Sequence, residues 1–206
     1  DLGRILTTID KRGGVTTNSW DEAGHLLSVY DALNGRTSYL YDANGNRTQM
    51  KGALNNITRY TYDANNRQKT VERIIGGQTL TTTYNYDALG RVTSTVNANS
   101  HADSTTYDGE GNVLARANAL AFSTTYVYDD DNRVTQTTDP EGRVTNTTYD
   151  KVGRVKTVKT AAGTTNYDYD ADGRLTASTD PRGKKTQYAY DAAGRLITLT
   201  DANSQI

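Results

Sequence analysis

One stretch of this sequence combines the residue types of a hydrolytic triad. His101, Asp103 and Ser104 lie within four positions. A triad requires its three side chains to converge beside an oxyanion hole, whereas neighbours on a strand point to opposite faces. The chain contains only two histidines, which leaves few candidates for general acid–base catalysis. We therefore predict no catalytic residues and a protein that is not an enzyme.

Carboxylates gather at two places that resemble cation sites. Residues 168–173 read DYDADG, the opening of an EF-hand loop, but Thr179 stands at the twelfth position, where a bidentate Glu is needed. Residues 129–131 are three consecutive Asp. Paired carboxylates on neighbouring turns could also imitate a glycosidase pair. All of these Asp residues are better explained by turns, and the chain has no Cys. We therefore predict no metal site and no cofactor.

Tyrosines form the one pattern with an open functional alternative. Aromatic rings stack on sugars and the hydroxyl adds a hydrogen bond, so an exposed row could bind glycans. Such rings could equally pack against the next hairpin. The candidates for glycan binding are Tyr39, Tyr60, Tyr84, Tyr126, Tyr167 and Tyr188.

A repeat positions all of these residues. An aromatic residue followed by Asp recurs nine times, with steps of 21, 21, 24, 21, 21, 21, 20 and 21 between the Asp residues. We call the two members of each pair the anchor aromatic and the anchor Asp. They are Trp20, Asp21, Tyr41, Asp42, Tyr62, Asp63, Tyr86, Asp87, Tyr107, Asp108, Tyr128, Asp129, Tyr149, Asp150, Tyr169, Asp170, Tyr190 and Asp191.

Each anchor Asp begins a turn. The third residue after it is Gly in seven copies and Asn in two, Asn66 and Asn132. Both types enter the left-handed region at low cost, so the pattern predicts a type I turn with a left-handed bulge residue. A second turn lies halfway along the repeat, as in Asp139-Pro140-Glu141-Gly142. Each repeat is then one hairpin, giving about eighteen short strands.

Alternation within the strands supports this assignment. Thr, Tyr and the anchor aromatic recur at every second position and share one face of the strand. We see no helical stripe. The predicted fold is therefore all-β: a single continuous array of stacked antiparallel hairpins over residues 1–206, about nine repeats of ~21 residues, forming a twisted, curling sheet without helices.

Composition restricts the function classes. Leu, Ile, Val and Phe number 34 of 206 residues, a low value that raises the alternative of disorder. The net charge is only −1, however, and 34 Thr and 15 Tyr supply strand-forming bulk. Near-zero charge argues against nucleic-acid binding. No apolar run reaches the length of a membrane span and no signal peptide opens the chain.

Several copies depart from the repeat. The step after Tyr62 carries three extra residues, for which we expect a longer loop or a bulge between Ile74 and Thr79. Most Arg residues follow the turn Gly, where we expect them to pair with the turn Asp or to cover a strand; His25 and Asn112 stand there instead. Both ends fall inside turns, so we expect the array to be incomplete at both ends.

The motif Tyr-Asp-x-x-Gly-Arg-(Leu/Val)-Thr resembles the YD repeats of Rhs proteins, teneurins and the shell subunits of insecticidal toxin complexes. Residues 128–150 and 169–191 resemble the pattern most. The resemblance implies a β-ribbon that spirals into a hollow shell. It further implies a bacterial protein, secreted or at the cell surface, whose shell encloses a toxic C-terminal cargo domain released by self-cleavage. The partners implied are the rest of the shell and that cargo; glycans stay an alternative.

Overall fold

The computed structural model describes residues 4–201, which are all-β and contain no helix. Nineteen strands follow one another along the chain, joined by short turns. They are β1 (Thr7–Ile9), β2 (Val15–Trp20), β3 (Leu26–Tyr30), β4 (Arg36–Tyr41), β5 (Arg47–Lys51), β6 (Ile57–Tyr62), β7 (Gln68–Ile75), β8 (Gln78–Tyr86), β9 (Val92–Val96), β10 (Ala102–Tyr107), β11 (Val113–Ala117), β12 (Ser123–Tyr128), β13 (Val134–Thr138), β14 (Val144–Tyr149), β15 (Val155–Thr160), β16 (Gly163–Tyr169), β17 (Leu175–Thr179), β18 (Lys185–Tyr190) and β19 (Leu196–Thr200). With no helix in this range, the described chain has none that could cross a membrane.

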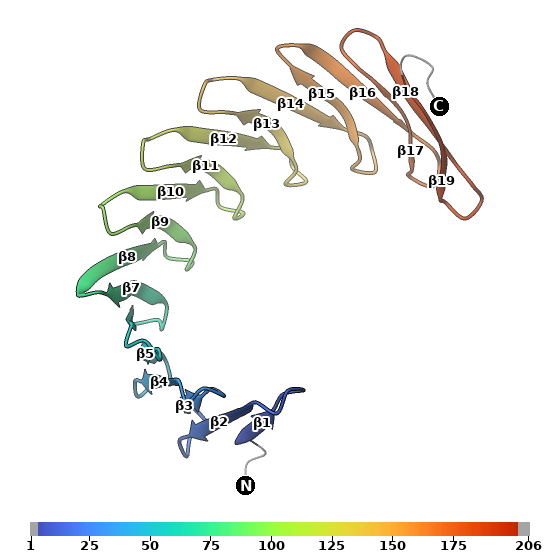
Figure 1. The fold of residues 1–206 in the computed structure, drawn as a ribbon. Helices are drawn as coiled ribbons and strands as arrows, with labels where there is room; N and C mark the ends of the chain where they lie inside the picture. Colours follow the sequence, from blue (N-terminus) through green and yellow to red (C-terminus); the bar gives the residue numbers. More distant parts are fainter. Residues whose placement is uncertain (1–3, 202–206) are drawn as a thin grey trace. The chain divides into compact units, whose positions relative to one another are not determined.

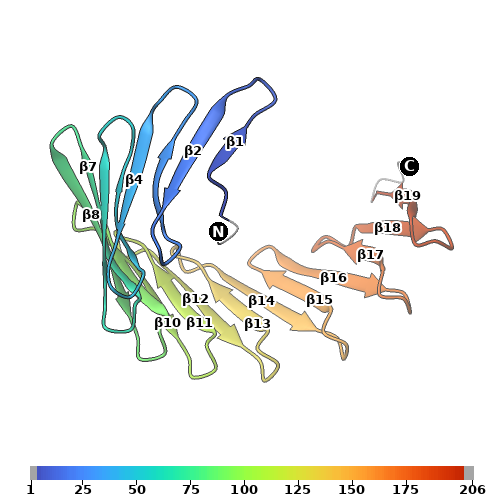
Figure 2. The same cartoon turned by 90° about the horizontal axis from the view of Figure 1, so that it is seen from below.

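The strands belong to two units, Asp1–Ser104 and Thr105–Ile206. Within each unit, consecutive strands pair antiparallel, so each unit is a succession of hairpins in chain order (Figure 1). Successive turns lie at opposite ends of the strands, so they alternate between the two long sides of each strip of hairpins (Figure 2). The predicted all-β hairpin architecture is confirmed. The nineteen strands exceed the expected eighteen because β1 precedes the first anchor.

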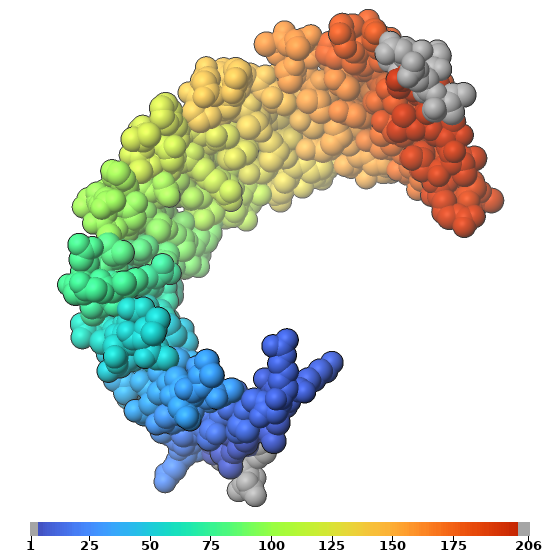
Figure 3. All heavy atoms as spheres, in the orientation of Figure 1, coloured from blue at the N-terminus to red at the C-terminus, as the bar shows by residue number. Residues whose placement is uncertain are grey.

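Within the described residues, each unit is a single layer of hairpins without a second layer of elements on its faces (Figures 1 and 2). Figure 3 shows the same chain with all its heavy atoms. Consequently no closed hydrophobic core forms in residues 4–201, where Ala177 and Ser28 are the buried residues, each 3% exposed. Large aliphatic side chains at the turn tips stand in solvent; Leu33 is 91% exposed. Contacts between neighbouring strands therefore replace a core as the source of stability.

The anchor turns have the predicted geometry. The Asp150 N–H donates to the Arg154 carbonyl at 2.8 Å, and the Gly153 N–H donates to the Asp150 carbonyl at 3.0 Å. Gly153 has φ +87°, and Asn66 and Asn132, which replace Gly, have φ +58° and +59°. The register of β14 against β15 shifts by one residue beside the turn, as a bulge requires.

The three extra residues after Tyr62 form neither a long loop nor a bulge, so that expectation is wrong. They lengthen β7 and β8, which stay in register as far as Ile75 and Gln78. Gly76 and Gly77 alone make the turn, with φ +58° and +81°. Two consecutive residues at positive φ form the tight hairpin turn that matches strand twist, and the Gly-Gly pair allows it at low cost.

The two faces of the sheet differ. In β6, Thr58, Tyr60 and Tyr62 are half-buried on one face, whereas Arg59 and Thr61 are exposed on the other. We call the first the Tyr face. On the opposite face short polar side chains bond across strands. Hydroxyl pairs at 2.7 Å are Ser19–Ser28, Thr61–Thr70 and Thr148–Thr157. Aromatic and hydroxyl ladders thus hold neighbouring strands together.

Candidate functional site: the link between neighbouring hairpins

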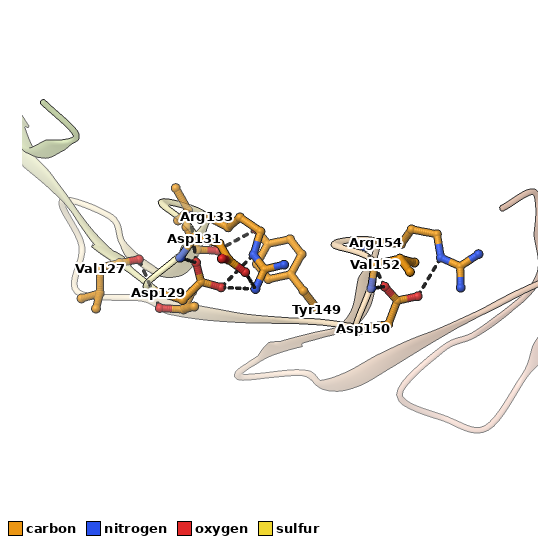
Figure 4. A network of polar contacts seen from close by, with 10 residues as sticks. Val127, Asp129, Asp131, Arg133, Tyr149, Asp150, Val152 and Arg154 are labelled. Carbon is orange, nitrogen blue, oxygen red and sulfur yellow. Dashed lines mark hydrogen bonds and ion pairs between the residues drawn. The ribbon is translucent and has the colours of Figure 1, made fainter. Parts of the chain in front are cut away.

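The anchor Asp organises its own turn. Asp129 Oδ1 accepts hydrogen bonds from the backbone N–H groups of Asp131 at 3.1 Å and Arg133 at 3.0 Å, and its Oδ2 accepts from Arg133 Nε at 2.8 Å (Figure 4). Asp131 also pairs with Arg133, at 2.9 Å from Nη2. One carboxylate therefore closes the turn and fixes the direction of the guanidinium.

The same guanidinium reaches the next hairpin. Arg133 lies over the ring of Tyr149, the following anchor aromatic, at 4.8 Å from its centroid (Figure 4). The Tyr149 hydroxyl donates back to the Val134 carbonyl at 2.8 Å. We call this set of anchor Asp, Arg and next anchor aromatic the inter-hairpin link. It combines an ion pair, a cation–π contact and a hydrogen bond to backbone in one half-buried place.

The link recurs along both units. Arg67 lies 4.6 Å from Tyr86, Arg154 lies 4.7 Å from Tyr169 and Arg174 lies 5.4 Å from Tyr190. Arg67 and Arg154 also donate from Nη1 to the next anchor Asp carbonyl, each at 3.1 Å. Anchor hydroxyls that donate to a carbonyl of the preceding repeat belong to Tyr41, Tyr62, Tyr86, Tyr128, Tyr149, Tyr169 and Tyr190.

Two departures from the repeat preserve the link by other means. Trp20 replaces the anchor Tyr, and its indole N–H donates to the Ile5 carbonyl at 3.1 Å. His25 replaces Arg: its Nδ1 lies 2.8 Å from Asp21 Oδ2, and its ring stacks on Tyr41 at 4.7 Å. The expected pairing of the post-turn Arg with the turn Asp is confirmed, for example at Arg91–Asp87, 2.6 Å.

The sequence analysis did not identify Asn46, which like Asn112 stands four residues after an anchor Asp, where most copies have Arg. It also did not predict the hydrogen bonds that these two Asn side chains make. Asn46 Nδ2 donates to Asp42 Oδ2 at 3.1 Å and to Asn66 Oδ1 in the next turn at 2.9 Å. Comparing the residue after each bulge with the bulge residue of the next copy would have found this pairing.

Hydrogen bonding controls the ionisation of the anchor carboxylates. The backbone N–H of Arg91, followed by its side chain, lowers the pKa of Asp87. At Asp129 the Arg133 side chain contributes most to the lowered pKa, and its backbone N–H comes next. Burial raises the pKa of the Tyr169 phenol. The turns thus favour charged carboxylates, and the anchor ring stays neutral.

Acidification should destabilise the protein. A carboxylate whose folded pKa is below its unfolded value contributes stability above the unfolded value, about 3.9 for Asp, and loses it as pH falls through the folded value. We expect the urea midpoint to be level above about pH 5 and to fall below about pH 4. Asp87→Asn should have a lower midpoint at pH 7 and a shallower fall, because the Arg91 pair is lost.

The Asp87→Asn variant should keep its turn, because Asn97 already accepts the N–H groups of Asn99 and His101 at 2.9 and 3.1 Å. Glu22→Gln removes a charge from an exposed turn tip of the same unit and serves as the control. It should follow the parent curve. Parallel curves for Asp87→Asn and the parent down to pH 3 would contradict the role given to this carboxylate.

The glycan candidates are all half-buried on the Tyr face: Tyr39, Tyr60, Tyr84, Tyr126, Tyr167 and Tyr188. Arg47 lies over both Tyr39 and Tyr60, at 5.8 and 4.9 Å from the centroids. A shallow groove of about 380 Å³ is lined by Tyr60, Tyr84, Gln68 and Arg73, among others. Glycan binding by these rings stays a prediction.

The side chains of the stretches that resemble a catalytic triad or a cation site do not converge on a common point. Asp103 and Ser104 are consecutive on β10 and therefore point to opposite faces. In the DYDADG stretch, Asp170 and Asp172 both pair with Arg174, each at 2.7 Å. These carboxylates already have a cationic partner in the turn. No cluster of three or more His, Cys, Asp or Glu that could hold a metal occurs within residues 4–201.

Comparisons of structure find neighbours among toxin complexes. A crystal structure of TcdB2-TccC3-Cdc42 superposes with a TM-score of 0.73 at 16% identity, covering 97% of this chain and 12% of that one. A crystal structure of TcdB2-TccC3 gives 0.62 at 15% identity, with 95% and 14% covered. The Photorhabdus luminescens Tc holotoxin pore gives 0.56 at 17% identity, with 91% and 13% covered. These likenesses show a shared fold over a small part of each neighbour.

Comparisons of sequence identify the family. No curated protein matches the chain. The family model described as RHS Repeat matches residues 20–57, and the one described as Teneurin YD-shell matches residues 56–206. The second match spans more than half of the chain and includes seven anchor turns, from the one at Asp63 to the one at Asp191. This chain therefore belongs to the teneurin YD-shell family.

Proposed function

We propose that this chain is a non-catalytic wall segment of a YD-repeat shell that encloses a cargo. The observation that carries the proposal is the inter-hairpin link, which joins successive hairpins at several places in both units. In Arg133, the same guanidinium pairs with Asp129 and covers Tyr149. A wall needs strong contacts between successive hairpins and no catalytic constellation, and the link supplies those contacts along the strip.

Membership of the YD-shell family and the fold shared with toxin-complex structures support this proposal. The partners are the remaining hairpins of the shell and a cargo domain C-terminal to it. A secreted or cell-surface bacterial protein is the context that the family likeness favours. The chain spans only 12–14% of the length of the structural neighbours cited above.

Electron microscopy of the longest natural chain that contains these residues tests the proposal. We expect a closed hollow particle with density inside it. Limited proteolysis of the same sample provides a second measurement, since an enclosed domain should be cleaved only after the shell is denatured. An open ribbon or a filament, or a cargo domain cut at the rate of a free domain, would overturn the container role.

Glycan binding is the second candidate, and one observation favours it. The groove between Tyr60 and Tyr84 combines two aromatic rings with the side chains of Gln68 and Arg73. Aromatic rings flanked by hydrogen-bond donors suit a sugar. The first candidate is preferred because Arg47 lies over both Tyr39 and Tyr60, a contact that supports a packing role for these rings.

A further inference from the structure

Two positions in successive turns vary together along this chain. The first is the residue four after an anchor Asp, a place that Arg4 takes by sequence alignment ahead of the first anchor. The second is the left-handed residue of the next anchor turn. Arg or His at the first position is always followed by Gly at the second, and Asn is always followed by Asn. The pairs are Arg4/Gly24, His25/Gly45, Asn46/Asn66, Arg67/Gly90, Arg91/Gly111, Asn112/Asn132, Arg133/Gly153, Arg154/Gly173 and Arg174/Gly194.

The Arg–Gly pairs whose two members lie in the same unit are in close contact. A Cβ added to Gly153 would lie 3.5 Å from Arg133 Nη1, and one added to Gly173 would lie 3.7 Å from Arg154 Nη1. These distances are ordinary contacts for a methyl group. A longer side chain that continues toward the preceding turn would have to enter the space of the guanidinium. A turn that carries Arg at the first position therefore leaves room for Gly at the second position, in the next turn, but not for the side chain of Asn.

The Asn–Asn pairs replace the guanidinium with a shorter bridge. Asn112 Nδ2 donates to its own anchor, Asp108 Oδ2, at 2.9 Å and to Asn132 Oδ1 in the next turn at 2.6 Å. Asn46 makes the equivalent bonds to Asp42 and Asn66 at 3.1 and 2.9 Å. The amide keeps the bond to the anchor Asp, and the Asn of the next turn provides the acceptor that the short side chain can reach.

We propose that this pair of residues is a neighbour-recognition code that fixes which hairpin can follow which. The chain uses two kinds of turn-to-turn pair, Arg or His with Gly and Asn with Asn, and the mixed combinations of Arg with Asn and Asn with Gly are unfavourable. Arg beside Asn places two side chains in one space. Asn beside Gly leaves an amide N–H without its acceptor. Similar hairpins in a repetitive chain can pair with the wrong neighbour or slip in register, and the code penalises such errors.

A double-mutant cycle on the second Asn pair tests the code in the full chain. Asn112→Arg alone should destabilise because the guanidinium meets the Asn132 amide, and Asn132→Gly alone should lose the bridge. The double variant recreates the Arg–Gly contact. We expect it to be more stable than the two single effects predict by about tenfold in the unfolding equilibrium constant. Urea unfolding measures the constants, and amide exchange in the 129–133 turn reports the local effect.

Substitutions of the same types in turns that are not neighbours provide the control. Asn112→Arg combined with Asn66→Gly should be additive to within about twofold, because Asn66 bonds Asn46 and not Asn112. Additivity in the neighbouring pair, or equal coupling in the control pair, would overturn the code.

A failure of Asn112→Arg to fold would still leave a decisive comparison. The code requires the double variant to be at least as stable as Asn132→Gly, because Arg gains its pairing with Asp108 once the next turn carries Gly. A double variant less stable than Asn132→Gly would refute the proposal without any measurement on the Asn112→Arg single.

Discussion

Replacing Tyr149 with Ala is expected to lower the free energy of unfolding by about 2–4 kcal/mol. The ring is half-buried beneath Arg133, at 4.8 Å from the guanidinium carbon, and its hydroxyl donates to the Val134 carbonyl at 2.8 Å. Truncation to Ala removes both contacts, and the Arg133 guanidinium then has no aromatic ring of the next hairpin to pack against. Urea unfolding followed by far-ultraviolet circular dichroism measures the loss.

Two control variants separate the contributions of Tyr149. Tyr149→Phe keeps the ring beneath Arg133 and removes only the hydrogen bond, so a loss of about 1 kcal/mol is expected. Val152→Ala truncates a side chain that is 73% exposed at the tip of the following turn and should be close to neutral. If Tyr149→Ala is no more destabilising than Val152→Ala, the inter-hairpin link does not contribute to stability.

The hairpin array was predictable because local chemistry determines it. Asp at the first position of a turn and Gly or Asn at the fourth specify a type I turn with a bulge, and strand alternation determines the face of each Tyr. The prediction failed at residues 74–79, where Gly76 and Gly77 make a two-residue turn and the extra residues extend β7 and β8. Insert length alone does not distinguish a longer loop from longer strands.

The inter-hairpin link was less accessible from the sequence. Pairing of Arg133 with Asp129 could be expected because both belong to one turn. The position of Arg133 over Tyr149 depends on how one hairpin packs on the next, which the spacing of residues does not specify. The bridge from Asn112 to Asn132 was missed for a related reason, since it joins two positions that look like independent exceptions to the repeat.

The recurrence of the link explains how a chain so poor in aliphatic residues can fold. The described residues include only two with exposures of 3% or less, so stability must be distributed along the sheet. In such an array each hairpin contacts only its neighbours, and stability is approximately a sum of local contributions. Losing several links in adjacent hairpins should therefore weaken one unit of the chain strongly.

Replacing Tyr39, Tyr60 and Tyr84 together with Ala is expected to lower the free energy of unfolding by roughly 3–6 kcal/mol, at about 1–2 kcal/mol for each half-buried ring. The three rings belong to β4, β6 and β8 of the first unit, and Arg47 covers two of them. Trp20, the only tryptophan, lies in the same unit, so its fluorescence follows the unfolding. The variant should also aggregate, because loosened hairpins expose strand edges.

The triple Ala variant also distinguishes the two proposed functions, a wall segment of a shell and a glycan-binding module. If the rings pack the sheet, the matched triple Tyr→Phe variant should retain most of the stability that the Ala variant loses, because it keeps all three rings. If the rings instead bind sugar, the Ala variant should unfold like the parent and lose retention on a glycan array. A triple Ala variant with the parent's urea midpoint would refute the packing role, and the groove lined by Tyr60 and Tyr84 would then become the leading candidate for a binding site.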